Sequence, residues 1–225
     1  MTNNKLIKHI KIFGERNSGT NFLTQLITKN IRNINVLSGG YDHGSCWKHA
    51  FPRIELFKEL DSTLFIFIIR DLDSWIKSMY SNPYHYKRPK NIEEFLTEKI
   101  QVDDKRCDHD VNIYEDEQQN IVDLRNAKIK SYLNFSKNVN NCVFINLEYL
   151  QKNDKNFLQF LNTNYSLNMK QYIPIEKHTK IKSKCKNRNY NMMLPEIIYE
   201  DAEIEKFVTS LKTKHYYKIS GVLKK

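Results

Sequence analysis

The segment that decides the fold is Ile10–Leu23, which reads IKIFGERNSGTNFL. Its apolar residues first alternate with polar ones, stop at Gly14, and resume with helical spacing after Gly19. This order predicts a strand, a short loop and a helix. Such a loop turns several backbone N–H groups toward one point at a helix N-terminus, where the helix dipole adds partial positive charge. The segment therefore predicts a site for a phosphate-like or sulfate-like anion, although an ordinary strand-to-helix turn has the same outline.

The composition limits the kind of protein to which this segment belongs. The chain has 225 residues and no Pro-, Gly- or Ser-rich linker, which predicts a single domain over residues 1–225. Its longest apolar run, Leu64–Ile69, is too short to span a bilayer, and no signal-type apolar block follows the N-terminus. We therefore expect a soluble, cytoplasmic protein without a membrane partner. The scattered cysteines predict free thiols and no zinc site.

The net charge of +10 favours anionic partners. Nucleotides, nucleic acids and sulfated or phosphorylated groups all meet that requirement, and charge alone does not choose among them. The basic residues Lys180, Lys182, Lys184, Lys186 and Arg188 recur at every second position. In an extended chain they face one way, which predicts either a solvated basic edge or a flap over an anion.

The clearest predicted strand is Thr63–Ile69, which is apolar on both faces and therefore belongs in the centre of a parallel sheet. It ends directly in Arg70. A guanidinium buried without an anionic partner is costly, so Arg70 is expected to meet either a bound anion or a nearby carboxylate. The next residues predict a helix that is capped by Asp71 or Asp73 and that turns inward Trp75, Ile76 and Met79.

Strands and helices alternate along the rest of the chain. Further strands are predicted at Ile34–Leu37 and Cys142–Leu147, and further helices at Asn91–Ile100, at about Gln118–Lys137, around Phe157–Leu161 and at Pro195–Leu211. This alternation indicates an α/β fold of three layers, with a central parallel sheet of about four to five strands flanked by helices.

Two further segments carry charged and polar side chains. Cys46–Pro52 places Lys48 and His49, a cation and a potential base, between two aromatic residues. This loop follows a predicted strand, and ligands of open α/β sheets bind beyond the carboxyl ends of strands, but a structural role for His49 stays open. The segment Asp103–Asp110 contains Asp-His-Asp without further ligands at a suitable spacing, so we expect a solvated loop and no metal site.

The anion loop lacks the side chains of a kinase or NTPase phosphate loop. That motif reads G-x-x-x-x-G-K-[ST], with the lysine on the phosphates and the hydroxyl on magnesium. Gly14 and Gly19 fit, but Thr20 takes the lysine position and Asn21 the hydroxyl position. The loop is therefore expected to bind a terminal anionic group without a metal ion.

Four separated places resemble sulfotransferases that use 3′-phosphoadenosine 5′-phosphosulfate (PAPS), a family with a P-loop NTPase-like fold. Asn17–Phe22, NSGTNF, is similar to the family's phosphosulfate loop KSGTTW. Arg70 and Ser78 match the arginine and serine that hold the 3′-phosphate. Lys48–Pro52, KHAFP, is similar to the KTHLP stretch that carries the catalytic histidine, and Phe144–Leu150 resembles a strand end late in the family's domain. Together these places cover residues 10 to about 160.

The resemblance implies transfer of a sulfuryl group from PAPS to a hydroxyl or amine acceptor, with PAP as the product and no metal. His49 would be the general base. The donor would be held by Asn17, Ser18, Gly19, Thr20 and Asn21 at the phosphosulfate, by Phe22 near the adenine, and by Arg70 and Ser78 at the 3′-phosphate. The acceptor would be a small molecule or a glycan, with no specific nucleic acid as partner. Candidates to line its pocket are Tyr41, Trp47, Tyr84, His85 and Tyr86.

One position departs from the family's pattern. Asn17 stands where cytosolic members have a lysine on the bridging oxygen, and we expect Arg16, or else Lys48, to supply that cation. Glu15 is the next candidate for the base, since other branches of the family use a carboxylate. Two alternative functions stay open: a nucleotide kinase of the same fold, and a non-enzymatic binder of nucleotides, nucleic acid or other polyanions.

Overall fold

A sheet lies at the centre of the protein. The computed structural model describes residues 6–37, 46–83, 86–87, 89–100, 120–175, 194, 202–214 and 216–219. Within these ranges the sheet has five strands in the order β2-β1-β3-β4-β5. Their bounds are β1 His9–Phe13, β2 Asn35–Leu37, β3 Thr63–Ile69, β4 Cys142–Asn146 and β5 Tyr216–Ile219.

Four of these strands run parallel, as the alternation of strands and helices predicted. β1 pairs with β2 on one side and β3 on the other, and β4 follows β3. β5 pairs antiparallel with β4 and was not predicted. All carboxyl ends of the four parallel strands therefore meet at one edge of the sheet, where the loops that follow β1 and β3 lie together.

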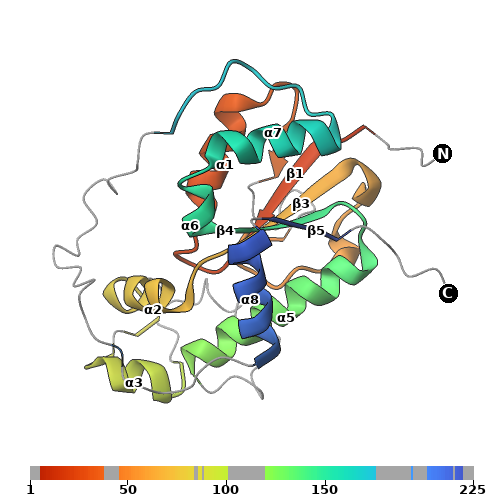
Figure 1. Ribbon diagram of the computed structural model, residues 1–225. Helices are drawn as coiled ribbons and strands as arrows, with labels where there is room; N and C mark the ends of the chain where they lie inside the picture. The colour runs from red at the N-terminus through yellow and green to blue at the C-terminus, as the bar shows by residue number, and fades with distance from the viewer. Residues whose placement is uncertain are drawn as a thin grey trace.

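Helices cover both faces of the sheet (Figure 1). On one face lie α1 Thr20–Asn30, α6 Leu147–Leu150 and α7 Asp154–Tyr165, and on the other lie α5 Ile121–Asn138 and α8 Ala202–Lys214. Two more helices, α2 Leu72–Ser81 and α3 Ile92–Thr97, lie beside the edge where the parallel strands end. Short 3-10 turns, η2 Ile54–Leu56 and η3 Leu60–Ser62, precede β3.

The two faces of the sheet carry different side chains. Toward α1 and α7 the strands present aliphatic residues such as Ile12, Ile66 and Ile145. Toward α5 and α8 they present rings, of which Phe67 stacks on Phe144 with centroids 4.8 Å apart. Every residue of β3 is buried. Because apolar side chains alternate between two covered faces, the three-layer α/β prediction is confirmed.

The helix ends refine the predicted boundaries. α1 begins directly after Gly19, as predicted. α5 begins at Ile121, three residues later than predicted, because Asn120 caps it in a reciprocal capping box with Asp123. Asp71 occupies the N-cap position of α2 but does not cap it. Its Oδ1 instead accepts from Asn146 Nδ2 at 2.7 Å, so the predicted aspartate cap is wrong and the residue links β3 to β4.

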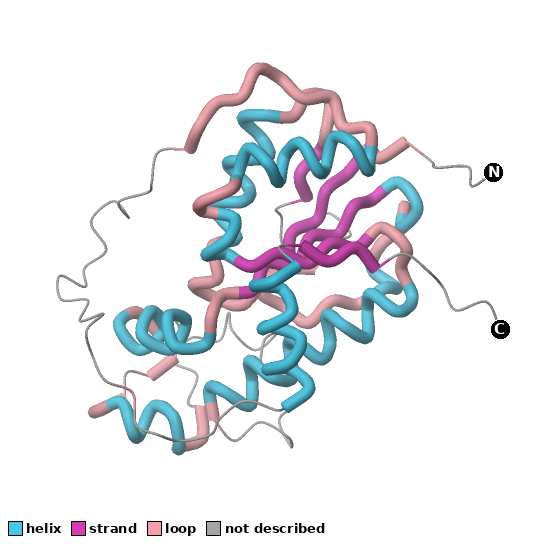
Figure 2. Tube along the Cα trace, viewed as in Figure 1, coloured by secondary structure: helices cyan, strands magenta, loops and turns pink. Residues whose placement is uncertain are grey.

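Several predicted features lie outside the described residues. They are Tyr41, Tyr84, His85, the Asp103–Asp110 segment, the basic Lys180–Arg188 segment and the first residues of the predicted Pro195–Leu211 helix. Of the cysteines, Cys46 and Cys142 are among the described residues, and both are free buried thiols. Figure 2 traces the described helices and strands along the chain.

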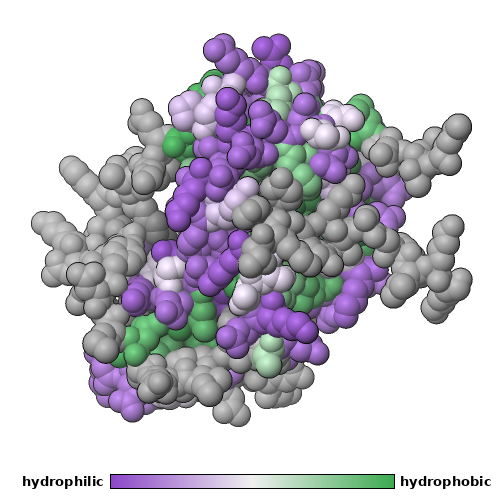
Figure 3. Space-filling view, in the orientation of Figure 1, coloured by the Kyte–Doolittle hydropathy of each residue, from purple (hydrophilic) through white to green (hydrophobic). Residues whose placement is uncertain are grey.

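The face of the protein in Figure 3 is hydrophilic over most of the described surface, with apolar atoms gathered where Figure 1 has α2 and α3. There the partly buried Leu72, Tyr80 and Ile92 complete an apolar cluster around Trp75. Among the described helices, none has the length and apolar character needed to cross a membrane.

Candidate functional site

The loop between β1 and α1 contains two residues in the left-handed backbone region. Asn17 and Gly19 adopt positive φ angles of 63° and 94°. Ser18 N donates to the carbonyl of Glu15 at 3.1 Å, and the Ser18 hydroxyl donates to the same oxygen at 2.6 Å. The first turn of α1 contains no acidic residue. The positive end of the α1 dipole therefore faces the loop without a competing carboxylate from its own first turn.

The two glycines of the loop are required by packing. A Cβ on Gly14 would lie 2.6 Å from the carbonyl oxygen of Ile68, and one on Gly19 would lie 2.4 Å from Leu147 Cδ1. The loop is therefore pressed against the end of β3 and the start of α6, with no room for side chains at these positions.

Asn17 turns its side chain away from α1. Its Nδ2 lies 3.2 Å from the carbonyl oxygen of Asn82 and 3.0 Å from Met79 Sδ, at the C-terminal end of α2. Asparagine tolerates the left-handed backbone conformation better than lysine does, because its short side chain hydrogen-bonds locally. The geometry gives Asn17 a structural task at the position where the resembling family has its lysine.

Arg70 joins the end of β3 to the loop. Its Nη1 donates to the Asn17 carbonyl at 3.1 Å, its Nε donates to Ser74 Oγ at 3.1 Å, and the same Nε lies 3.6 Å from Glu148 Oε1. The side chain is 18% exposed, and the Glu148 carboxylate lies beside its guanidinium. The carboxylate partner expected for Arg70 is thus present, and a bound anion would be an additional partner.

Lys48 and His49 meet the loop through its backbone. Gly14 N donates to the Lys48 carbonyl at 3.1 Å, and the Gly14 carbonyl accepts from His49 Nδ1 at 2.7 Å. Lys48 Nζ donates to the side-chain oxygen of Asn21, in the first turn of α1. The structure therefore places the predicted cation and the predicted base next to the β1–α1 loop.

The hydrogen bond of His49 fixes its tautomer. Because a carbonyl oxygen only accepts, Nδ1 carries a proton, and in the neutral ring Nε2 keeps its lone pair. Burial lowers the pKa of His49 well below 6.5, and the nearby ammonium groups of Lys48 and Lys128 and the Arg16 guanidinium lower it further, against the Gly14 carbonyl. His49 is therefore a neutral imidazole at physiological pH, with one nitrogen able to accept a proton.

Arg16 is held by aromatic rings. Its guanidinium carbon lies 4.5 Å from the centroid of Trp47 and 5.8 Å from that of Tyr86, and its carbonyl accepts from Trp75 Nε1 at 2.8 Å. Burial and the Arg16 charge together lower the pKa of Lys48. Arg16 and Lys48 therefore form one positive region beside the loop.

The remaining predicted residues differ in their exposure. Ser18, Thr20 and Ser78 are buried, Asn21 is exposed, and Phe22 is partly buried against the aliphatic core. The described structure thus gathers the loop with Lys48, His49 and Arg70, whereas the side chains of Ser78 and Phe22 contribute to the packing of α2 and α1.

The sequence analysis named Glu15 as a candidate base but missed two buried cations beside it, Arg125 and Lys128. Glu15 and Arg125 are both buried, with Glu15 Oε1 and Arg125 Nε 3.6 Å apart. Lys128, also buried, donates from Nζ to the His49 carbonyl at 2.7 Å. The signal that could have found the two cations is their place on the apolar stripe of α5, in register with Ile121 and Tyr132.

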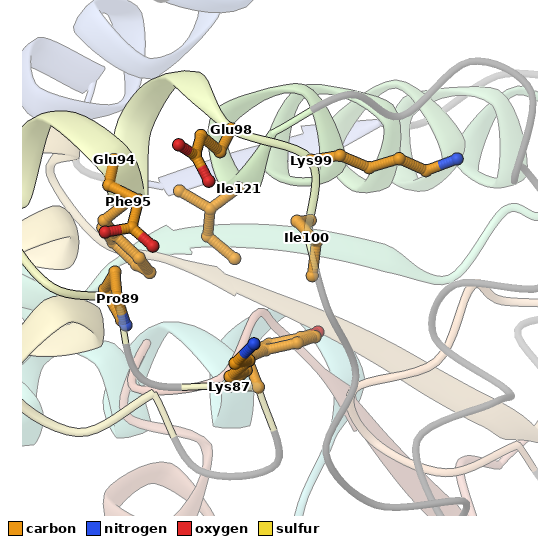
Figure 4. Close-up of a pocket in the computed structure, with 9 residues that line it drawn as sticks. Lys87, Pro89, Glu94, Phe95, Glu98, Lys99, Ile100 and Ile121 are labelled. Atoms are coloured by element: carbon orange, nitrogen blue, oxygen red, sulfur yellow. The ribbon is translucent and has the colours of Figure 1, made fainter.

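Two cavities lie next to this charged group. The inner one, of about 10 Å³, is lined by Glu15, Arg16, Arg125 and Lys128 together with apolar residues, and has room for a water molecule. The outer one, of about 60 Å³, lies between α3 and the start of α5. Its walls include Lys87, Phe95, Ile100 and the carboxylates of Glu94 and Glu98, whereas Lys99 points away (Figure 4).

Tyr86 and Ile121 line both cavities. Tyr86, predicted for the acceptor pocket, thus connects the outer cavity with Arg16. Trp47 contacts both Arg16 and His49, and its ring meets the imidazole edge-on with centroids 4.9 Å apart. In the part of the chain that the structure describes, no group of three His, Cys, Asp or Glu residues is placed to hold a metal ion.

Comparison with known proteins adds no relative: no family model, no curated protein and no solved structure matches the chain.

Proposed function

We propose that the protein is a PAPS-dependent sulfotransferase with His49 as the general base. The observation that carries the proposal is the double contact of Gly14 with the Lys48–His49 segment. It supports a site in which a neutral imidazole stands beside an anion loop and a helix N-terminus. Group transfer from an anionic donor to a hydroxyl or amine uses both, a base for the acceptor and a site for the anion.

PAPS would supply an activated sulfuryl group, which passes to the acceptor oxygen or nitrogen as the bond to the leaving phosphate breaks. The residues of the chain would bind and orient the reactants. Lys48 and the N-terminus of α1 would stabilise negative charge on the phosphosulfate, and Arg70 would meet the 3′-phosphate. His49 Nε2 would accept the proton that leaves the acceptor.

The donor set suits a phosphosulfate better than a magnesium nucleotide. The described loop offers backbone N–H groups, an ammonium at Lys48 and a guanidinium at Arg70, and it has Thr20 and Asn21 at the positions of the phosphate-binding lysine and magnesium-binding hydroxyl of NTPases. Arg16, beside Lys48, is the cation proposed in place of the family lysine, because the Asn17 side chain is hydrogen-bonded to the end of α2.

The test is a thermal-shift comparison of PAP, PAPS, ATP and ADP, each with magnesium and with a chelator. We expect PAP and PAPS to raise the melting temperature by about 5 °C or more at a large excess over Kd, without magnesium. A larger shift with ATP and magnesium would replace the proposal with a nucleotide kinase. Equal shifts with any polyanion, all lost at moderate salt, would replace it with a polyanion binder.

A further inference from the structure

Two cations of α5 reach the loops of the candidate site from inside the protein. Arg125 and Lys128 stand three residues apart on the helix and expose only 1% and 2% of their surface. The spacing places them on the same side of α5, one turn apart. Their long side chains therefore run through the interior and end at the site.

Each cation ends on a backbone carbonyl of a residue that the proposed reaction uses. Lys128 Nζ donates to the His49 carbonyl at 2.7 Å, and Arg125 Nη2 donates to the Arg70 carbonyl at 2.9 Å. Arg125 Nε also lies 3.6 Å from Glu15 Oε1. One helix thus holds the β1–α1 loop, the His49 segment and the end of β3 in fixed relation to one another.

These contacts affect the protonation state of His49 as well as its position. A hydrogen bond from a charged donor is stronger than one from a neutral donor, and a cation close to an imidazole in a low-dielectric interior disfavours the imidazolium. Three cations lie near His49 and disfavour its protonated form: Lys48 on its own segment, Arg16 on the β1–α1 loop and Lys128 on α5. The Gly14 carbonyl, which follows β1, accepts from Nδ1 and favours the protonated form.

We propose that Lys128 is a positioning residue, which holds the His49 backbone against the anion loop and keeps the imidazole neutral, and that Arg125 secures Arg70 and Glu15 in the same way. The consequence for catalysis rests on the proposed function, because it takes His49 as the base. The place and protonation of the ring do not depend on that function.

The experiment is a pH titration of the His49 ring, followed by NMR of the imidazole C–H signals and assigned with His49→Gln. Lys128→Met removes the charge and the donor, and we expect the ring to titrate at a higher pH than in the wild type. Lys128→Arg restores a cation and is expected to return the titration toward the wild-type position. Lys137→Met, the same change at an exposed position of α5, is the matched control and should leave the ring unaffected.

Turnover gives a second readout. Displacement of His49 in Lys128→Met should lower kcat roughly 10- to 100-fold, while the Kd for PAP changes little. If the methionine variant does not fold, Lys128→Gln removes the charge and keeps a polar N–H donor on a shorter side chain. An unchanged His49 titration in a folded variant overturns the proposal. Failure of the wild type to bind PAP would instead overturn the proposed function, and the titration would still decide the role of Lys128.

Discussion

His49 carries the proton transfer of the proposed reaction through a single nitrogen. His49→Gln removes that acceptor, so we expect turnover to fall by roughly 10²- to 10⁴-fold, measured as PAP release from PAPS with phenol, amine and sugar acceptors. The Kd for PAP should stay nearly unchanged, because the loop and Arg70, and not His49, would hold its two phosphates. His9→Gln, at the opposite end of β1, is the matched control. Retained turnover in His49→Gln would move the base elsewhere, with Glu15 next.

The low pKa of His49 makes a separate prediction for the pH dependence of the wild type. A general base acts in its neutral form, and the buried ring stays neutral as the pH falls through 6.5, the ordinary value for histidine. We therefore expect kcat to remain level through pH 6.5 and to decline only at lower pH. A pH–rate profile with saturating PAPS measures this, and a decline centred at 6.5 would mean that the base is an exposed histidine.

Arg70 offers a test of which phosphate the site recognises. If its guanidinium meets the 3′-phosphate, Arg70→Gln should weaken PAP binding roughly 10- to 100-fold and leave the affinity for AMP, which lacks that phosphate, almost unchanged. Isothermal titration of both ligands gives the ratio. Arg32→Gln, at an exposed position after α1, controls for loss of one positive charge. Equal losses of affinity for PAP and AMP would mean that Arg70 has only a structural role, linking Glu148 to the loop.

At the scale of elements, the contact between the anion loop and α6 depends on Gly19. Gly19→Ala imposes a side chain at a φ of 94° and within 2.4 Å of Leu147 Cδ1, so we expect a loss of about 2–4 kcal/mol in the free energy of unfolding. Urea denaturation measures it. The double variant with Leu147→Ala should lose less than the sum of the two single variants, because the smaller side chain relieves the clash. Strict additivity would show that the backbone conformation alone requires glycine.

Elements whose pattern is set by local sequence could be predicted, and those set by distant partners could not. α1 and β3 have unbroken helical or apolar patterns, and both were found where expected. β5 is four residues long and forms by pairing with β4, so its short sequence carries little signal. The aspartate cap of α2 failed for a similar reason, because Asp71 is taken by Asn146 of a neighbouring strand.

The candidate site divides in the same way. The loop, Lys48, His49 and Arg70 could be proposed from sequence because each stands at a strand end or beside one. The side-chain directions of Asn17 and the burial of Arg125 and Lys128 depend on how α2 and α5 pack against those loops. Helical periodicity puts both cations on the apolar stripe of α5, but it does not show which backbone carbonyls they meet.

At the scale of the whole molecule, the buried ammonium of Lys11 couples stability to pH. Lys11 lies fully buried in β1 and donates to the Cys46 carbonyl, and burial lowers its pKa to about 8 from 10.5. Between these two values the unfolded chain binds the proton and the folded protein does not. The contribution of Lys11 to the free energy of unfolding therefore rises with pH over this interval, by roughly 3 kcal/mol.

Other buried groups act in the opposite direction, so the test must isolate Lys11. Burial raises the pKa of the Cys142 thiol and of the Tyr165 hydroxyl, and the unfolded chain loses those protons first, which lowers stability as the pH rises. The difference in free energy of unfolding between wild type and Lys11→Met cancels these groups. We expect urea denaturation to show that the free energy of unfolding of the wild type rises relative to that of Lys11→Met from pH 8 to 10.5. The exposed Lys29→Met should show no such change relative to the wild type. A flat difference for Lys11→Met would mean that water reaches the Lys11 ammonium within the folded sheet.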